Sequence, residues 1–197
     1  MISLRLFIAL ELNNHIWGKL ESVITYLKSC NLPSVRWIPV RNTHLTLKFL
    51  GEVSDDKLPE IINMVRETAS SFHSLNIAAS GIGVFPNIRQ PRIIWAGISI
   101  TEELFRLQKT IETASGKCGF PVETRPYSPH LTLGRFSEHV QTREITRMIQ
   151  AINRFDSKDL GSVFVETVNL FKSDLRPGGA VYTIVEKAPL MGVKIIS

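Results

Sequence analysis

The chain has 197 residues, 44% of them hydrophobic, and a formal net charge of +5. This length and composition are typical of one globular domain or two closely packed lobes, and they exclude a mainly disordered chain. No apolar run approaches the roughly 20 residues that a membrane-spanning helix needs, and the basic charge balance mildly favours an anionic partner such as RNA.

Strand-like runs alternate with helical stretches along the chain. Alternating or apolar runs predict strands at 2–10, 35–38, 44–50, 75–85, 92–100, 121–125, 130–136, 162–171 and 180–187. Four stretches with helical apolar spacing follow candidate N-cap residues: Asn13 or Asn14, Ser54 or Asp55, Thr101 and Thr142.

The order strand, helix, short strand, strand, helix, strand occurs twice. This repetition predicts an α+β fold in which two β-α-β-β-α-β units, related by a pseudo-twofold axis, form two lobes with mainly antiparallel sheets around a central cleft. The expected organisation is one domain over residues 1–197. Its internal repeat covers approximately 1–88 and 89–175, and a C-terminal strand follows.

One tetrapeptide also occurs twice: residues 44–47 and residues 130–133 both read His-Leu-Thr-Leu. Each copy lies in a predicted strand, where successive side chains point to opposite faces. The leucines therefore face a core, and the histidine and threonine of each copy project together from the other face. Residues two apart on a strand lie roughly 7 Å apart, so an imidazole and a hydroxyl can contact the same small group.

Two histidines, each with a hydroxyl beside it, suit in-line displacement at a phosphodiester. His44 and His130 would supply one proton donor and one proton acceptor, because an unperturbed imidazole pKa of about 6.5 permits both states near neutral pH. Thr46 and Thr132 would donate hydrogen bonds to the non-bridging phosphoryl oxygens. Either histidine alone is more simply a strand residue with satisfied hydrogen bonds, so the prediction depends on the pair.

No cofactor and no metal are expected. A cyclic phosphate is strained, which lowers the need for a metal, and the sequence lacks a metal-type cluster near either tetrapeptide, a Walker loop and a nucleophile elbow. Cys30 and Cys118 lie in no metal-type spacing, and we expect reduced thiols in a cytoplasmic protein.

These motifs resemble those of the two-histidine phosphoesterases, which are defined by two His-x-Thr-x motifs. Within that superfamily the chain is most similar to the RNA 2′,3′-cyclic phosphodiesterases, also called 2′–5′ RNA ligases. The likeness spans nearly the whole chain and includes the segments 5–10, 44–51, 83–86, 91–97, 129–135 and 178–182.

The resemblance implies a two-lobed α+β fold with a central cleft and no metal. It also implies hydrolysis of RNA 2′,3′-cyclic phosphate ends to 2′-phosphate ends, with His44 as the proton donor to the leaving 3′ oxygen and His130 as the base that activates water. The reverse reaction would join a 5′-hydroxyl end through a 2′–5′ linkage. The sequence alone does not assign the two roles, because the two motifs are identical.

Further residues are candidates for substrate contacts. Strict alternation puts Arg135 on the leucine face, but a bulge at Gly134 would return it to the cleft, where the family often has an arginine that binds phosphate. Arg5 and Phe7 share one face of the first strand and are candidates for an anion contact and a base-stacking surface. Lys48 has the parity of the first histidine. The alternative for Arg5 is a surface arginine, for Phe7 a half-buried phenylalanine, and for Lys48 a solvated lysine at a sheet edge.

Two other functions stay open at this level. One is an esterase for a small cyclic phosphate, such as a cyclic nucleotide or an ADP-ribose derivative, and the other is a non-catalytic RNA-binding module. The expected partners are RNA 3′ ends that bear a 2′,3′-cyclic phosphate, or cyclic nucleotides. We expect no membrane association, and a monomer is the default.

Overall fold

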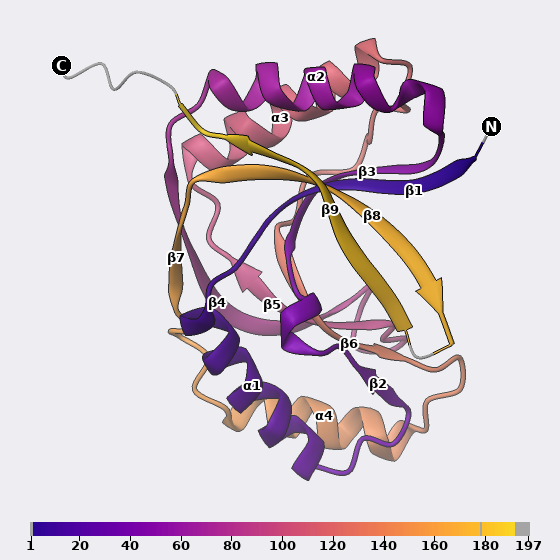
Figure 1. Cartoon of the computed structure of the whole chain (residues 1–197). Helices are drawn as coiled ribbons and strands as arrows, with labels where there is room; N and C mark the ends of the chain where they lie inside the picture. Colours follow the sequence, from indigo (N-terminus) through magenta and orange to yellow (C-terminus); the bar gives the residue numbers. More distant parts are fainter. Residues whose placement is uncertain (1, 178, 192–197) are drawn as a thin grey trace, which may run out of the picture.

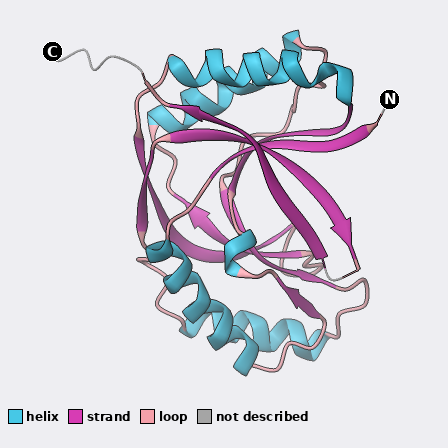
Figure 2. Ribbon diagram, viewed as in Figure 1, coloured by secondary structure: helices cyan, strands magenta, loops and turns pink. Residues whose placement is uncertain are grey.

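The computed structural model describes residues 2–177 and 179–191, so Gly178 of the similar segment 178–182 lies outside the described residues. The described chain forms two antiparallel sheets and four α-helices (Figures 1 and 2). The first sheet has the strand order β3 (Leu45–Ser54), β1 (Ser3–Leu10), β8 (Thr167–Arg176) and β9 (Gly179–Pro189). The second has the order β2 (Val35–Trp37), β6 (His130–Phe136), β5 (Ile93–Ile98), β4 (Leu75–Phe85) and β7 (Ser162–Val165).

Each sheet takes strands from both halves of the chain. In the first sheet β3, β1 and β8 are neighbours, and in the second β6, β5 and β4 stand in the same order. The strands that carry the two tetrapeptides, β3 and β6, therefore have equivalent places. The prediction of an α+β fold with mainly antiparallel sheets is confirmed, although in the described residues the second half has no short strand between α3 and β6. We propose that the chain forms one domain with the repeat limits given above.

The helices cover the outer sides of the two sheets (Figure 1). The helices α2 (Leu58–Ser70) and α3 (Glu102–Lys117) contact the first sheet, and α1 (Asn14–Ser29) and α4 (Thr142–Arg154) lie on the second. Each sheet is thus covered by one helix from each half of the chain. None of the helices in the described residues is long and apolar enough to cross a membrane.

Two of the predicted helix caps are confirmed and two are wrong. The side chain of Asn13 accepts a hydrogen bond from the amide of Ile16, and Thr101 caps α3 in the same way. The helix α2 begins only after a short 3₁₀ turn over Asp55–Lys57, and α4 is preceded by Gln141, whose side chain makes no capping bond.

Two strand predictions need correction. Residues 121–125 form no strand, because they are exposed and pair with no neighbouring strand, so no sheet face holds them. The predicted strand 162–171 is two strands, because β7 pairs with β4 in the second sheet and β8 pairs with β1 in the first. The chain changes sheet at Glu166.

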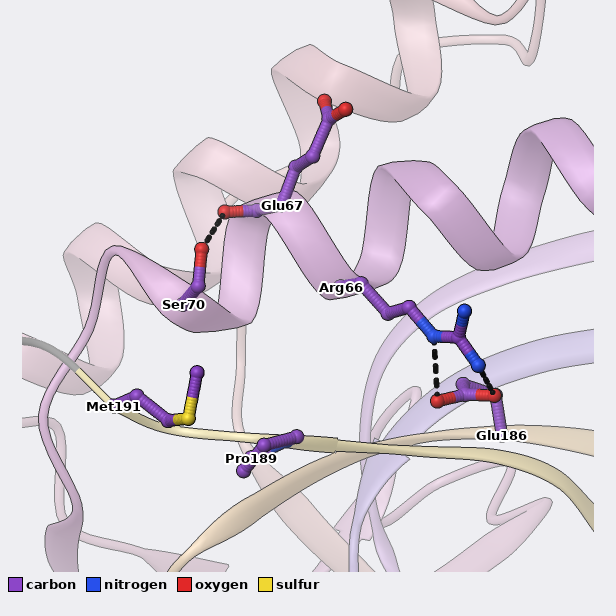
Figure 3. Close-up of a pocket in the computed structure, with 6 residues that line it drawn as sticks. All are labelled: Arg66, Glu67, Ser70, Glu186, Pro189 and Met191. Atoms are coloured by element: carbon purple, nitrogen blue, oxygen red, sulfur yellow. Dashed lines mark hydrogen bonds and ion pairs between the residues drawn. The ribbon is translucent and has the colours of Figure 1, made fainter.

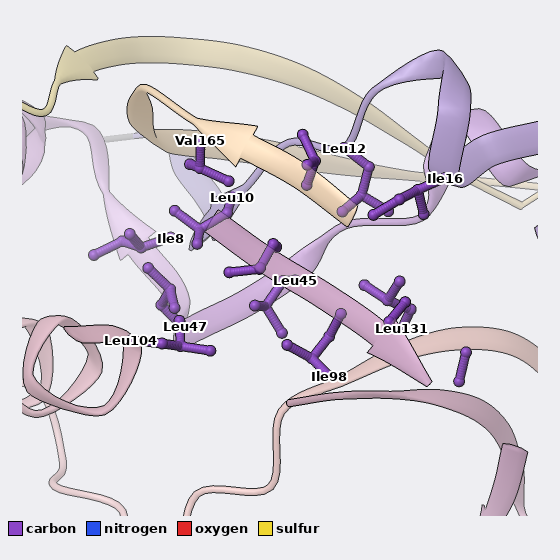
Figure 4. Packing of buried hydrophobic residues seen from close by; sticks show 14 of the residues in the cluster. Ile8, Leu10, Leu12, Ile16, Leu45, Leu47, Ile98, Leu104, Leu131 and Val165 are labelled. Atoms are coloured by element: carbon purple, nitrogen blue, oxygen red, sulfur yellow. The ribbon is translucent and has the colours of Figure 1, made fainter. Parts of the chain in front are cut away.

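The leucines of both tetrapeptides lie in one hydrophobic core. Leu45, Leu131 and Leu133 are fully buried, and Leu47 is buried almost as completely. Figure 4 shows Leu45, Leu47 and Leu131 among the buried residues of this cluster. Burial of each leucine contributes about 1.5–3 kcal/mol, which fixes the face of each strand that is left for the histidine and threonine.

Candidate active site

The two histidines are held by the same backbone contact. His44 Nδ1 lies 3.0 Å from the carbonyl oxygen of Asn42, and His130 Nδ1 lies 2.8 Å from the carbonyl oxygen of Ser128. A carbonyl oxygen only accepts, so Nδ1 of each ring donates and carries the proton. Nε2 is then the atom on each ring that can take up or give a proton.

The threonines follow the predicted alternation. Thr46 and Thr132 are half-buried, and the leucines on either side of each are buried. Thr46 lies opposite Ala9 on β1, and Thr132 lies opposite Trp95 on β5. Each threonine therefore shares a strand face with its histidine, as the alternation requires.

A β-bulge lies at the last residue of each tetrapeptide. On β3, Thr46 pairs with Ala9 and Lys48 with Ile8, so Leu47 is the extra residue. On β6, Thr132 pairs with Trp95 and Gly134 with Ile94, so Leu133 is the extra residue. Because of the extra residue, every side chain beyond the bulge points to the face opposite to the one that simple alternation predicts. Alternation counted from each histidine therefore gives the wrong face after the second leucine.

The bulge on β6 gives Arg135 an exposed position on the histidine side. Its charge acts on His130 and lowers the pKa of that imidazole. The extra residue is Leu133, one position before the predicted Gly134. Gly134 has another function: a β-carbon there would lie 2.7 Å from the Val35 side chain, so only glycine lets β2 pack this closely.

The bulge on β3 turns Lys48 into the interior, so the predicted parity of Lys48 is wrong. Lys48 is 6% exposed and forms an ion pair with the buried Glu112 of α3. It also donates a hydrogen bond to the carbonyl oxygen of Pro121, and the same glutamate accepts from the amide of Glu123. Lys48 thus binds β3, α3 and the segment after α3 together, and it does not lie beside the histidine.

Phe7 lies at the centre of a cluster of aromatic rings that surrounds His44. The two rings stack with centroids 4.6 Å apart, and the rings of Phe171 and Tyr182 lie 5.9 and 5.0 Å from the imidazole. Phe7 is only 2% exposed, so it supports the histidine and has no free face on which a base could stack. Arg5 is exposed on the same strand, opposite Glu52, and its anion contact stays a prediction.

Phe49 is a candidate that the sequence did not reveal. It occupies the place on β3 that Arg135 occupies on β6, is 65% exposed, and its ring lies 5.9 Å from that of Phe7. The only signal in the sequence was that Phe49 and Arg135 have the same spacing from their histidines.

Burial lowers the pKa of both imidazoles. The pKa of His44 falls from 6.5 to about 4 because the ring is desolvated, although its bond to the Asn42 carbonyl acts in the opposite direction. The pKa of His130 falls through burial and through the charge of Arg135, against the effect of the Ser128 carbonyl. The ring of Phe85 packs edge-on against His130 at 5.0 Å. Both histidines are therefore mainly neutral at pH 7 in the free protein.

Tyr127 connects the two motifs. Its hydroxyl donates a hydrogen bond of 3.0 Å to the carbonyl oxygen of Thr46, while its own residue lies three positions before His130. Burial raises the pKa of Tyr127, so the hydroxyl keeps its proton and remains a donor. The strands β3 and β6 are also in contact. This hydrogen bond attaches the segment just before the second tetrapeptide to the backbone of the first tetrapeptide.

The cavity shown in Figure 3 is separate from these residues. It has a volume of about 320 Å³, lies between α2 and the end of β9, and contains the Arg66–Glu186 ion pair. Its lining consists of Arg66, Glu67, Ser70, Glu186, Pro189 and Met191. None of the predicted site residues contributes to it.

The model of the LigT-like phosphoesterase family matches residues 10–95 and 98–182, and so includes both tetrapeptides. The chain belongs to this family. The RNA 2′,3′-cyclic phosphodiesterase of Methanothermobacter thermautotrophicus is 34% identical over 185 residues, which cover 94% of this chain and 98% of that protein. The enzyme of the same name from Methanocaldococcus jannaschii is 30% identical and covers 93% and 99%.

Solved structures of similar proteins agree with the fold of this phosphoesterase. TT0787 of Thermus thermophilus superposes with a TM-score of 0.76 at 26% identity, over 95% of this chain and 98% of that one. Escherichia coli LigT complexed with 3′-AMP gives a TM-score of 0.74 at 24% identity, over 96% and 99%, and shows the same fold.

The side chains near the motifs of this phosphoesterase suit proton transfer. Nδ1 of each imidazole is bonded to a backbone carbonyl, and two threonine hydroxyls and one guanidinium lie on β3 and β6. Within residues 2–177 and 179–191, no group of three or more His, Cys, Asp or Glu side chains is arranged to hold a metal ion. Cys30 and Cys118 are both free thiols.

Proposed function

We propose that this phosphoesterase hydrolyses RNA 2′,3′-cyclic phosphate ends to 2′-phosphate ends by paired-histidine acid–base catalysis. The observation that supports this most directly is the duplicated His-Thr motif, in which each imidazole donates through Nδ1 to a carbonyl two residues earlier and so keeps Nε2 for chemistry. The names of the relatives from M. thermautotrophicus and M. jannaschii indicate the same substrate.

In the proposed reaction, a water molecule attacks phosphorus in line with the bond to the 3′ oxygen. Nε2 of His130 accepts a proton from this water as the new P–O bond forms. The bond from phosphorus to the 3′ oxygen breaks, and Nε2 of His44 protonates that oxygen. The products are a 2′-phosphomonoester and a 3′-hydroxyl, and exchange with solvent restores both histidines. The two roles follow the family resemblance.

Donors around the phosphate would complete the site. The hydroxyls of Thr46 and Thr132 bind the non-bridging oxygens, where charge builds up in the transition state. Arg135 adds a positive charge on the side of His130. No step requires a metal, because protons and hydrogen bonds supply the stabilisation.

The protonation states support a substrate that is itself anionic. A histidine with a pKa of about 4 carries little proton at pH 7, so the donor must become protonated when the phosphate is bound. A nearby negative charge raises an imidazole pKa, and the cyclic phosphate provides such a charge. Phe49 is the exposed aromatic on this side, and we assign it to stacking with the terminal base.

Microscopic reversibility gives the site a second reaction. If the 5′-hydroxyl of another RNA takes the place of water, the same proton transfers form a 2′–5′ phosphodiester from the cyclic end. Hydrolysis and ligation would therefore share every residue named above.

The test is product identification on an oligonucleotide that ends in a 2′,3′-cyclic phosphate. We expect a 2′-phosphate end with a free 3′-hydroxyl, formed at the same rate in excess EDTA. A 3′-phosphate product would overturn the assignment of the leaving oxygen, and loss of activity in EDTA would show that a metal takes part.

A further inference from the structure

Two arginines lie side by side at the edge of the second sheet. Arg36 on β2 pairs directly with Arg135 on β6 in the antiparallel register. Both residues are exposed. Directly opposite residues have Cβ atoms roughly 4.5–5.5 Å apart and share a face, so the two positive charges repel each other and destabilise the sheet.

The face that they share is the face of the proposed site. Val35, the neighbour of Arg36, is buried and packs against Gly134 on the core side of the sheet. Alternation places Arg36 on the opposite side. Arg135 is on that side too, and its charge reaches the imidazole of His130.

No acidic side chain in the described part of the chain balances this pair. Neither arginine takes part in any of the ion pairs or side-chain hydrogen bonds found among residues 2–177 and 179–191. Glu144, which lies close to the start of β2, accepts hydrogen bonds from the amide and hydroxyl of Ser34 and is 2% exposed, so its carboxylate is already taken. An anion from outside the chain would offset the repulsion between the two guanidinium groups.

The order of the strands indicates which anion fits. His130 pairs with Gly97 of β5, on one side of β6, whereas Arg36 lies on β2, on the other side. A nucleic acid strand that runs from the imidazole toward the sheet edge meets Arg135 first and Arg36 second. Arginine binds phosphate through two parallel N–H donors, and phosphate contacts fix the register of a bound strand.

We propose that Arg36 binds the internucleotide phosphate next to the 3′-terminal nucleotide, while Arg135 faces the cyclic phosphate. This inference rests on the proposed function. It names the preferred substrate class as RNA of two or more nucleotides with a cyclic phosphate end. A cyclic mononucleotide lacks the second phosphate and leaves Arg36 unpaired.

The experiment compares two substrates, a 2′,3′-cyclic mononucleotide and a dinucleotide with the same cyclic end. The measured quantity is the kcat/KM of the dinucleotide divided by that of the mononucleotide. Arg36→Ala is expected to lower this ratio about tenfold, which is the effect of losing one charge-assisted hydrogen bond. Arg36→Lys keeps the charge and should restore most of the ratio. Arg106→Ala, at an exposed position on α3, is the matched control and should leave the ratio at its wild-type value.

A neutral linkage tests the contact itself. A dinucleotide with an internucleotide methylphosphonate should lose about tenfold in kcat/KM with the wild-type protein and nothing further with Arg36→Ala. Independent losses, or an Arg36→Ala variant that weakens both substrates equally, would overturn the inference. A wild-type protein that turns over neither substrate would overturn the proposed function, and this inference with it.

Discussion

His44 and His130 are held by the same backbone contact but lie in different surroundings. Three aromatic rings surround His44, and the exposed residue beyond its bulge is Phe49. His130 has one aromatic neighbour, Phe85, and the exposed residue beyond its bulge is Arg135. The two copies of the motif share the contact between Nδ1 and a backbone carbonyl and differ in the side chains around the imidazole. The surroundings of His44 are aromatic and those of His130 include a positive charge, and the function proposed above assigns the nucleobase to the first and the phosphate to the second.

The largest effect is expected from removing either imidazole. His44→Ala and His130→Ala should each lower kcat by about 10²–10⁴-fold or more, because each deletes a proton-transfer group that the other cannot replace. Initial rates on a cyclic-phosphate dinucleotide measure this, with His139→Ala at an exposed position as the control. If one of the two variants kept most of the activity, the mechanism would depend on one histidine and not on two.

Lys48 directly follows the bulge on β3 and forms a buried ion pair, whereas its counterpart on β6 is Gly134, which has no side chain. We therefore expect a large effect on stability from a substitution of Lys48. Lys48→Met leaves Glu112 buried without its partner, and we expect a loss of about 3–5 kcal/mol in the free energy of unfolding. Urea denaturation measures it. The double variant Lys48→Met/Glu112→Leu should recover most of the loss, because it removes both charges. A double variant as unstable as the single one would show that the lysine does not act through this ion pair.

Phe49, two residues beyond the bulge on β3, tests whether this side of the site binds the nucleobase. Phe49→Ala should raise KM for a cyclic nucleotide about tenfold, since stacking on an aromatic ring contributes about 1–3 kcal/mol per base. Steady-state kinetics measure this. Phe164→Ala, on β7 and 61% exposed, is the matched control. An equal effect on kcat with no change in KM would contradict a binding role.

The smallest effect is a shift in pH dependence. The active pair holds one proton, so kcat/KM should be bell-shaped, with a lower limb near the His44 pKa of about 4 and an upper limb below 6.5. Tyr182→Ala opens the cluster to solvent, which raises the pKa of His44 and moves the lower limb upward. If Tyr182→Ala left the pH profile of kcat/KM unchanged, burial by the Tyr182 ring would not be the cause of the low His44 pKa.

Burial of His44 also has a consequence for folding. Its pKa is lowered in the folded state, so below about pH 6.5 the unfolded chain binds a proton that the folded chain does not. Its contribution to stability is therefore lost as the pH falls from about 6.5 toward 4, and His44→Gln should reduce this loss.

Local patterns predicted the strands, the helices and the two motifs well. Alternation with buried leucines identified the face of His44 and His130, because it depends only on side-chain period and burial. It failed at Lys48, since a bulge is a property of two paired strands and leaves no mark in one of them. The separation of 162–171 into two strands and the bond from Tyr127 to Thr46 depend in the same way on partners distant in sequence.

The exchange of β4 and β8 between the two halves has a mechanical consequence. Cutting the chain between the halves would leave β1 without β8 and β5 without β4, with open hydrogen-bonding edges on both pieces. Each half therefore needs a strand from the other half to complete its sheet. The relative position of His44 and His130 is therefore set by the folding of the whole chain.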